Sequence, residues 1–144
     1  MGLTISVHVH PPTRGAHDVL DILVEEEVDL TRVVLGHLDT ALSHDDIKIG
    51  DAIDYHKALA DRGAFIEYDL CGITGFFSDG AHSWWFPSDR ERCIGIVGII
   101  EAGYGKQLLI SQDVGHKHYL SSFGGWGVAH VLTQVKDMLI SFGV

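Results

Sequence analysis

Cysteine is scarce in this sequence: the chain has 2, too few for a disulfide framework. We therefore expect Cys71 and Cys93 to be reduced thiols in a cytoplasmic protein and not a bridge. Positive charge is scarce as well, because 10 Lys and Arg stand against 20 Asp and Glu. The formal net charge of -10 at pH 7 argues against nucleic acid or an anionic membrane as a partner.

Long apolar runs are also missing. The longest, around Cys93 to Ile100, is far too short to span a membrane. The first nine residues lack the basic start and the apolar region of a signal peptide. The 144 residues suffice for one domain with a substantial core but not for two, and 46% hydrophobic with 21% charged residues is typical of a soluble globular protein. We predict a single domain over residues 1–144.

Four segments with strand character alternate with four helical segments. The first segment alternates apolar and polar residues before Pro11-Pro12, and the second, Val33 to Leu35, is short and rich in β-branched residues. The helical segments place apolar residues three and four apart, and Ser88 with Glu91 fits a capping box. The predicted strands are 3–10, 33–35, 64–69 and 107–111, and the predicted helices are 16–28, 45–62, 88–102 and 128–142.

This alternation predicts an α/β fold with a parallel sheet and right-handed crossovers. Two long segments, Leu70 to Phe86 and Val114 to Gly127, are predicted as loops, and loops of that length are usually functional or mobile. In the first, Trp84 and Trp85 form either a hydrophobic substrate wall or a local cluster of the loop's own aromatic residues. In the second, Lys117 either contacts an anionic or carbonyl group or lies on the solvated surface.

Each predicted strand has a metal-competent side chain at its carboxyl end. His8 and His10 share one face of the first strand, and His37 ends the second. Asp69 and Asp113 end the third and the fourth. Since imidazoles and carboxylates are the ligands of zinc and related ions, neighbouring strands would gather a metal site at this edge of the sheet. The alternative is that each of these residues is a structural group with an ordinary hydrogen bond.

Several stretches are specific enough to suggest a family. They are Gly36-His37-Leu38-Asp39, Glu67-Tyr68-Asp69 and Ser111-Gln112-Asp113, with further agreement over 88–92 and 123–130. In collinear order from about residue 4 to the end, they resemble the phosphotriesterase family of the amidohydrolase superfamily, including its lactonases. The resemblance implies a (β/α)8 TIM barrel with a two-metal hydrolytic site at its carboxyl face. This chain would form a partial barrel, about four βα units that correspond to strands 5–8.

The resemblance also implies roles for the strand-end residues. His8 and His37 resemble ligands of one metal ion. Asp113 resembles a ligand of a second ion and the catalytic group that handles the proton of the attacking hydroxide. His10 is a candidate extra ligand. The implied cofactor is a divalent metal, zinc first, with manganese, iron or cobalt as alternatives and two ions per full site.

The predicted substrate-binding residues are Tyr68 and Asp69, where the family places pocket residues, together with Lys117, Trp84 and Trp85. The implied activity is metal-dependent hydrolysis of an ester bond by a metal-activated hydroxide. The implied partners are small molecules: a carboxylic ester, a lactone or an organophosphate triester.

Two expected parts of the family's site have no counterpart in this sequence: the His-x-His of strand 1 and the carboxylated lysine of strand 4. Half a barrel also leaves two sheet edges unpaired and its inward face uncovered. We therefore expect a homo-oligomer, in which two copies rebuild an eight-stranded closure, or pairing with a missing N-terminal half. The alternative function is a catalytically silent, metal-binding or self-assembling half-barrel.

Overall fold

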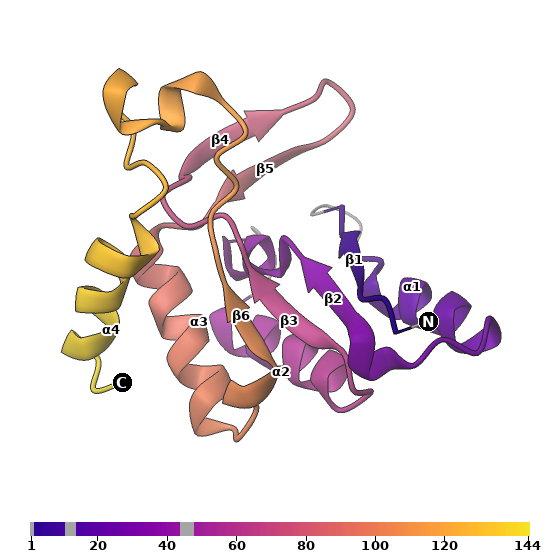
Figure 1. Ribbon diagram of the computed structural model, residues 1–144. Coiled ribbons are helices and arrows are strands. Elements are labelled where there is room, and N and C mark those ends of the chain that lie inside the picture. Colours follow the sequence, from indigo (N-terminus) through magenta and orange to yellow (C-terminus); the bar gives the residue numbers. More distant parts are fainter. Residues whose placement is uncertain (1, 11–13, 44–47) are drawn as a thin grey trace.

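A computed structural model describes residues 2–10, 14–43 and 48–144. Its centre is a four-stranded parallel sheet in the order β1-β2-β3-β6 (Figure 1). The strands are β1 (Ile5–His8), β2 (Val33–Gly36), β3 (Phe65–Tyr68) and β6 (Leu108–Ile110). All four predicted strands and their parallel alternation with helices are confirmed.

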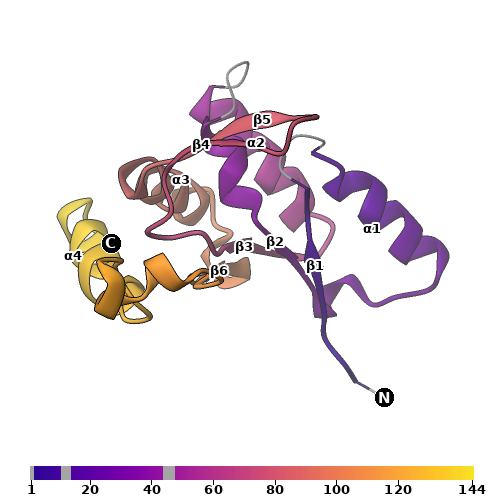
Figure 2. The ribbon, with the colours of Figure 1, turned by 90° about the horizontal axis from the view of Figure 1, so that it is seen from above.

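Three helices cover one face of this sheet, as the view from above shows (Figure 2). They are α1 (Ala16–Glu25), α2 (Ile49–Ala60) and α3 (Asp89–Glu101). The predicted capping box begins α3, where Ser88 and Glu91 exchange side-chain and backbone hydrogen bonds. The last helical segment is a π-helical turn followed by α4, and it packs beside α3; the bounds are Val131–Val135 and α4 (Lys136–Ser141).

The core lies between the sheet and these helices. Strand residues alternate between the two faces, so that Leu35, Ile66 and Tyr68 point toward the helices and are fully buried. Leu59 of α2 and Ile96 of α3 meet them from the other side. The apolar helix stripes read from the sequence therefore face the sheet, as expected.

The opposite face of the sheet has a different character. It carries Ser6 and His8 of β1, Glu67 of β3 and Leu109 of β6, and Leu109 is 37% exposed. None of α1, α2 and α3 lies on this face (Figure 2). Within the described residues, β1 and β6 each pair with one neighbour, which leaves both edges of the sheet open.

The predicted loop 70–86 is wrong in part, because it contains an antiparallel hairpin of β4 (Gly75–Ser78) and β5 (Ser83–Phe86). The Asp79 N–H donates to the His82 carbonyl to close the turn, and Gly80 adopts a left-handed φ of 90°. Aromatic residues favour strands, so this stretch could pair with itself once a turn formed.

Other expectations concern single features. Cys71 and Cys93 are free, as expected, and both are buried. The predicted stop at Pro11-Pro12 and the predicted helix start at Asp45 lie outside the described residues. Among the residues that are described, no helix combines the length and the apolar character needed to cross a membrane.

Candidate functional site

Two histidines from neighbouring strands meet at the carboxyl end of the sheet. His8 is the last residue of β1 and pairs in register with Gly36, so that His37 follows directly beside it. His8 Nδ1 and His37 Nε2 are 3.0 Å apart, and the two rings lie edge to face with centroids 3.8 Å apart. The parallel register of β1 and β2 thus brings together two imidazoles that are 29 residues apart in the sequence.

Asp69, just beyond β3, fixes the orientation of His37. Its Oδ1 accepts a hydrogen bond from the His37 backbone N–H at 2.9 Å and another from the ring Nδ1 at 2.8 Å. The backbone bond supports His37 in a left-handed conformation, φ 61°, which a residue with a side chain adopts at a cost. A Cβ on Gly36 would lie 2.8 Å from Asp69 Oδ2, so only glycine admits this carboxylate.

The pKa values of the two rings are shifted in opposite directions. Burial, followed by repulsion from His37, lowers the pKa of His8, so its imidazole is neutral at pH 7. Burial also acts to lower the pKa of His37, but the hydrogen bond and the charge of Asp69 outweigh it and raise that pKa. His37 is thus a ring whose Nδ1 hydrogen is committed to Asp69 and whose Nε2 faces His8.

Both histidines line an open cavity of about 350 Å³ on the uncovered face of the sheet. Asp69 and Asp113 share this cavity, Asp113 from just beyond β6. The Oγ of Ser111 donates to Glu67 Oε1 at 3.0 Å on the same sheet face. The full lining is Ser6, Val7, His8, Gly36, His37, Asp69, Ser111, Gln112 and Asp113. The predicted set of His8, His37 and Asp113 therefore lines a single cavity.

The donor set fits a divalent metal ion. Nitrogen ligands at 2.0–2.1 Å around a tetrahedral ion lie about 3.3 Å apart, close to the separation of His8 Nδ1 and His37 Nε2. The bond from His37 Nδ1 to Asp69 matches the carboxylate–histidine pairing that orients metal-bound imidazoles in proteins. Two converging nitrogens, one of them on an oriented ring, are donors that zinc or a related ion accepts, and the Asp113 carboxylate lines the same cavity.

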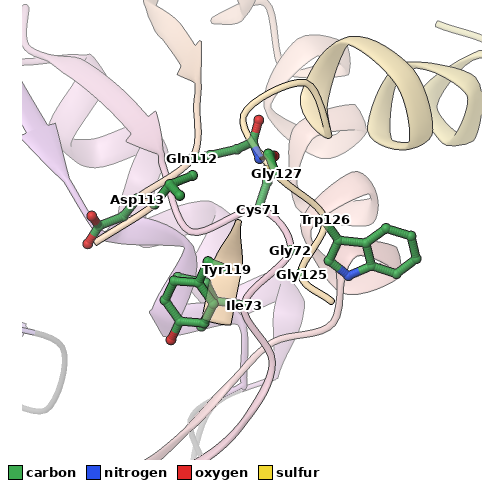
Figure 3. Close-up of a pocket in the computed structure, with 10 residues that line it drawn as sticks. Cys71, Gly72, Ile73, Gln112, Asp113, Tyr119, Gly125, Trp126 and Gly127 are labelled. Carbon is green, nitrogen blue, oxygen red and sulfur yellow. Dashed lines mark hydrogen bonds between the residues drawn. The ribbon is translucent and has the colours of Figure 1, made fainter. Parts of the chain in front are cut away.

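A second, smaller cavity of about 40 Å³ adjoins Asp113 (Figure 3). Gln112 and Asp113 point in different directions from the strand end, Gln112 toward Gly127 and the Asp113 carboxylate away from it (Figure 3). Gln112 Nε2 donates to the Gly127 carbonyl at 2.5 Å, and its Oε1 accepts from the Val131 N–H at 3.2 Å. Gln112 therefore fastens the loop beside the candidate metal ligand, a role that spacing alone did not reveal.

Tyr68 does not occupy the predicted substrate position. Its side chain is fully buried on the helix side of β3, and its hydroxyl is 2.8 Å from His56 Nδ1. The alternation of β3 explains this placement, because Tyr68 points away from the face that carries Glu67 and Asp69. The expectation that Tyr68 contacts a substrate is wrong for this structure.

Four other predicted residues lie outside the cavity lining. His10 follows the end of β1 and packs against His82, with ring centroids 5.3 Å apart. Trp84 and Trp85 pack on rings of their own hairpin, which is the local-cluster alternative. Lys117 Nζ lies 4.4 Å from the centre of the Phe123 ring.

The Asp of Gly-His-x-Asp, Asp39, belongs to a buried charge network that local sequence pattern does not reveal. The network explains why an Asp follows His37 so closely. Arg92 is fully buried and donates from Nε to Asp39 at 2.5 Å and from Nη1 to Asp89 at 2.9 Å. Asp89 Oδ2 in turn lies 2.6 Å from His130 Nε2. This network joins the turn after β2, the start of α3 and the last helical segment, and so supports the backbone that carries His37.

Four parallel βα units with metal-competent side chains at one carboxyl edge define the class of this protein: a segment of an α/β barrel with a candidate metal centre. The chain belongs to the phosphotriesterase family, whose profile matches residues 1–144. The predicted family resemblance is confirmed.

Similar proteins are known both as sequences and as structures. The N-acetyltaurine hydrolases of Dictyostelium discoideum and Danio rerio are 32% and 28% identical to this chain, over 99% and 100% of it. A resiniferatoxin-binding protein from Rhodobacter sphaeroides matches the whole chain with a TM-score of 0.89 and 35% identity. The phosphotriesterase homology protein from Escherichia coli, complexed with phosphate in its active site, matches the whole chain with a TM-score of 0.77 and 24% identity.

The chain is much shorter than these relatives. It covers 36% and 39% of the two hydrolases, and 37% and 43% of the two solved chains. Since the solved neighbours are barrel proteins, the four βα units described here correspond to part of such a barrel, and the predicted partial barrel is confirmed.

Proposed function

We propose that this chain provides the metal-binding half of a metal-dependent hydrolase that acts on ester bonds of small molecules, such as a lactone, a carboxylic ester or a phosphotriester. The observation that supports the proposal is the convergence of His8 Nδ1 and His37 Nε2, 3.0 Å apart, in a cavity that Asp113 shares. Membership of the phosphotriesterase family supports the same class of reaction.

Each side chain has its own task in this proposal. His8 and His37 hold a divalent ion, zinc first, through Nδ1 and Nε2, and Asp69 keeps the His37 ring in the required tautomer and rotation. When bound, the ion supplies Lewis-acid activation of water and of the substrate's carbonyl or phosphoryl oxygen. The Asp113 carboxylate, exposed in the same cavity, accepts the proton released by the attacking water.

The remaining ligands and the other wall of the substrate pocket come, in this proposal, from βα units beyond the four described. The open edges at β1 and β6 are where such units would pair. A similar protein is an N-acetyltaurine hydrolase, so an N-acyl amide joins the esters as a substrate class to be examined.

Metal content and turnover test the proposal directly. The chain is loaded with Zn²⁺, and the unbound Zn²⁺ is then removed. We expect the wild-type chain to retain bound Zn²⁺, and His37→Ala to retain one ion fewer per chain. His118→Ala, an exposed histidine of another loop, is the matched control and should keep the wild-type content. Equal metal content in wild type and His37→Ala would refute the proposed site. The type of bond that is hydrolysed is then identified from turnover of a lactone, an aryl ester, a phosphotriester and an N-acyl amide, each measured with and without chelator.

A second candidate is a catalytically silent half-barrel that assembles with a copy of itself. The uncovered sheet face and the two open edges of the described sheet favour it. We then expect a dimeric molar mass in solution, reduced to that of a monomer by Leu109→Lys on the open face, whereas Ile22→Lys on exposed α1 has no effect. Turnover that disappears with chelator would exclude a silent role.

A further inference from the structure

A second cluster of metal-competent side chains lies outside the cavity of His8 and His37. The ligand atoms of His10, Asp79 and His82 all lie within 4.8 Å of one another, and the three residues are exposed. His10 follows the end of β1, whereas Asp79 and His82 flank the turn between β4 and β5. Two segments almost 70 residues apart in the sequence therefore meet at this cluster.

The turn holds the Asp79 carboxylate in place. Its Oδ1 accepts hydrogen bonds from the backbone N–H groups of Ala81 at 2.9 Å and of His82 at 2.7 Å. These bonds lower the pKa of Asp79, so that it is ionised at neutral pH. Its other oxygen, Oδ2, lies 3.7 Å from His82 Nδ1. A fixed, ionised carboxylate beside an imidazole needs little rearrangement to share a cation.

The hairpin also positions the third ligand. The His10 ring packs edge-on against His82, with centroids 5.3 Å apart, and against Trp84 at 6.0 Å. Trp84 is itself supported by the Phe77 ring of β4 at 4.6 Å. The aromatic cluster of the hairpin, first considered as a substrate wall, thus serves as the support for an imidazole from the neighbouring segment.

We propose that His10, Asp79 and His82 form a second metal site, for a first-row divalent ion such as Zn²⁺ or Co²⁺, that fastens the β4–β5 hairpin to the segment following β1. Two imidazoles, one carboxylate and an open fourth position are a ligand set that such ions accept. Ligand atoms around a tetrahedral ion lie about 3.3 Å apart, so side-chain rotations close the present separations of up to 4.8 Å. None of the three residues lines the cavity of the proposed hydrolytic site, so this inference stands without that function.

Titration of the chain with Co²⁺, followed by its visible absorption, tests the site. His37→Ala serves as the background, since it removes a ligand of the other candidate centre. In this background we expect one Co²⁺ per chain, and at least a tenfold loss of affinity on adding His82→Ala or Asp79→Asn. Asp79→Asn is the sharper variant, because its amide oxygen still accepts the two backbone hydrogen bonds of the turn. His118→Ala is the matched control and should leave the affinity unchanged.

Hydrogen exchange measures whether the bound metal restrains the β4–β5 hairpin. Zn²⁺ is expected to slow amide exchange in residues 75–86 of the His37→Ala chain and to have no such effect once His82→Ala is added. Co²⁺ affinity that survives both His82→Ala and Asp79→Asn would overturn the proposal. So would an equal loss in His118→Ala, because binding would then reflect exposed histidines in general.

Discussion

Asp69 Oδ1 accepts two hydrogen bonds from His37, one from the backbone N–H at 2.9 Å and one from the ring Nδ1 at 2.8 Å. A single oxygen thus fixes both the left-handed backbone of His37 and the rotation of its imidazole. The ring is left with Nε2 directed at His8 Nδ1. Asp69 was expected to contact substrate; its described contacts make it the residue that orients a candidate ligand.

Replacing Asp69 should therefore weaken metal binding without removing a ligand. Asp69→Asn is expected to lower Zn²⁺ affinity by about 10–100-fold, because the ring loses the charged partner that fixes its tautomer. Isothermal titration calorimetry measures the change, with Asp54→Asn on the exposed side of α2 as the control. Wild-type affinity in Asp69→Asn would contradict the orienting role.

Gly36 should be as important as Asp69, although it has no side chain. In Gly36→Ala the new Cβ would lie 2.8 Å from Asp69 Oδ2 and 3.4 Å from the Val7 carbonyl, so the carboxylate must move away from His37. We expect a loss of about 1–3 kcal/mol in the free energy of unfolding, as for other overpacked sites, together with weaker Zn²⁺ binding. Urea denaturation and calorimetry measure the two effects.

Gly50 provides the matched control for that substitution. It lies in the first turn of α2, and a Cβ there meets no atom within 4 Å. Gly50→Ala should raise stability by up to about 1 kcal/mol through helix propensity and leave Zn²⁺ binding unchanged. If both alanine variants behave alike, the close approach of Asp69 to Gly36 has no special importance.

The local sequence pattern predicted the sheet well, because each strand is a short apolar run that ends in a polar residue. The same pattern placed His8, His37 and Asp113 at one edge of the sheet, and in the structure these three residues line one cavity. It could not predict the direction of Tyr68, because a one-residue difference in strand register moves a side chain to the other face. Roles that depend on distant partners, such as that of Asp69, appear only when the strands are placed side by side.

The sequence itself contains a signal for the β4–β5 hairpin. Gly75-Phe76-Phe77-Ser78 and Ser83-Trp84-Trp85-Phe86 are aromatic segments separated by four residues that include Gly80. By contrast, nothing local distinguishes the π-helical turn Val131–Val135 from an α-helix, because its apolar spacing fits both. The buried pairing of Arg92 with Asp39 is equally invisible, since the two residues are 53 positions apart.

Arg92 should be among the most sensitive positions for stability. Arg92→Ala leaves the buried carboxylate of Asp39 and the partly buried carboxylate of Asp89 without their cation, so we expect a loss of about 3–5 kcal/mol in the free energy of unfolding. Urea denaturation measures it. Lys57→Ala, which removes an exposed ion pair with Asp54, is the control and should have no measurable effect. A small loss in Arg92→Ala would show that the network is not needed for the fold.

His56 should make the stability of the chain depend on pH. Burial lowers the pKa of this fully buried imidazole to about 3 from its ordinary 6.5, and its Nδ1 lies 2.8 Å from the Tyr68 hydroxyl. The unfolded chain takes up this proton below pH 6.5 while the folded chain does not, so stability falls as the pH falls from 6.5 toward 3. Between pH 7 and pH 5 this proton uptake lowers the free energy of unfolding by about 2 kcal/mol.

Urea denaturation at pH 5, 6 and 7 measures how the free energy of unfolding depends on pH. His56→Gln should remove this part of the pH dependence, and His118→Gln on the surface should not. Identical slopes in wild type and His56→Gln would mean that another group causes any acid destabilisation.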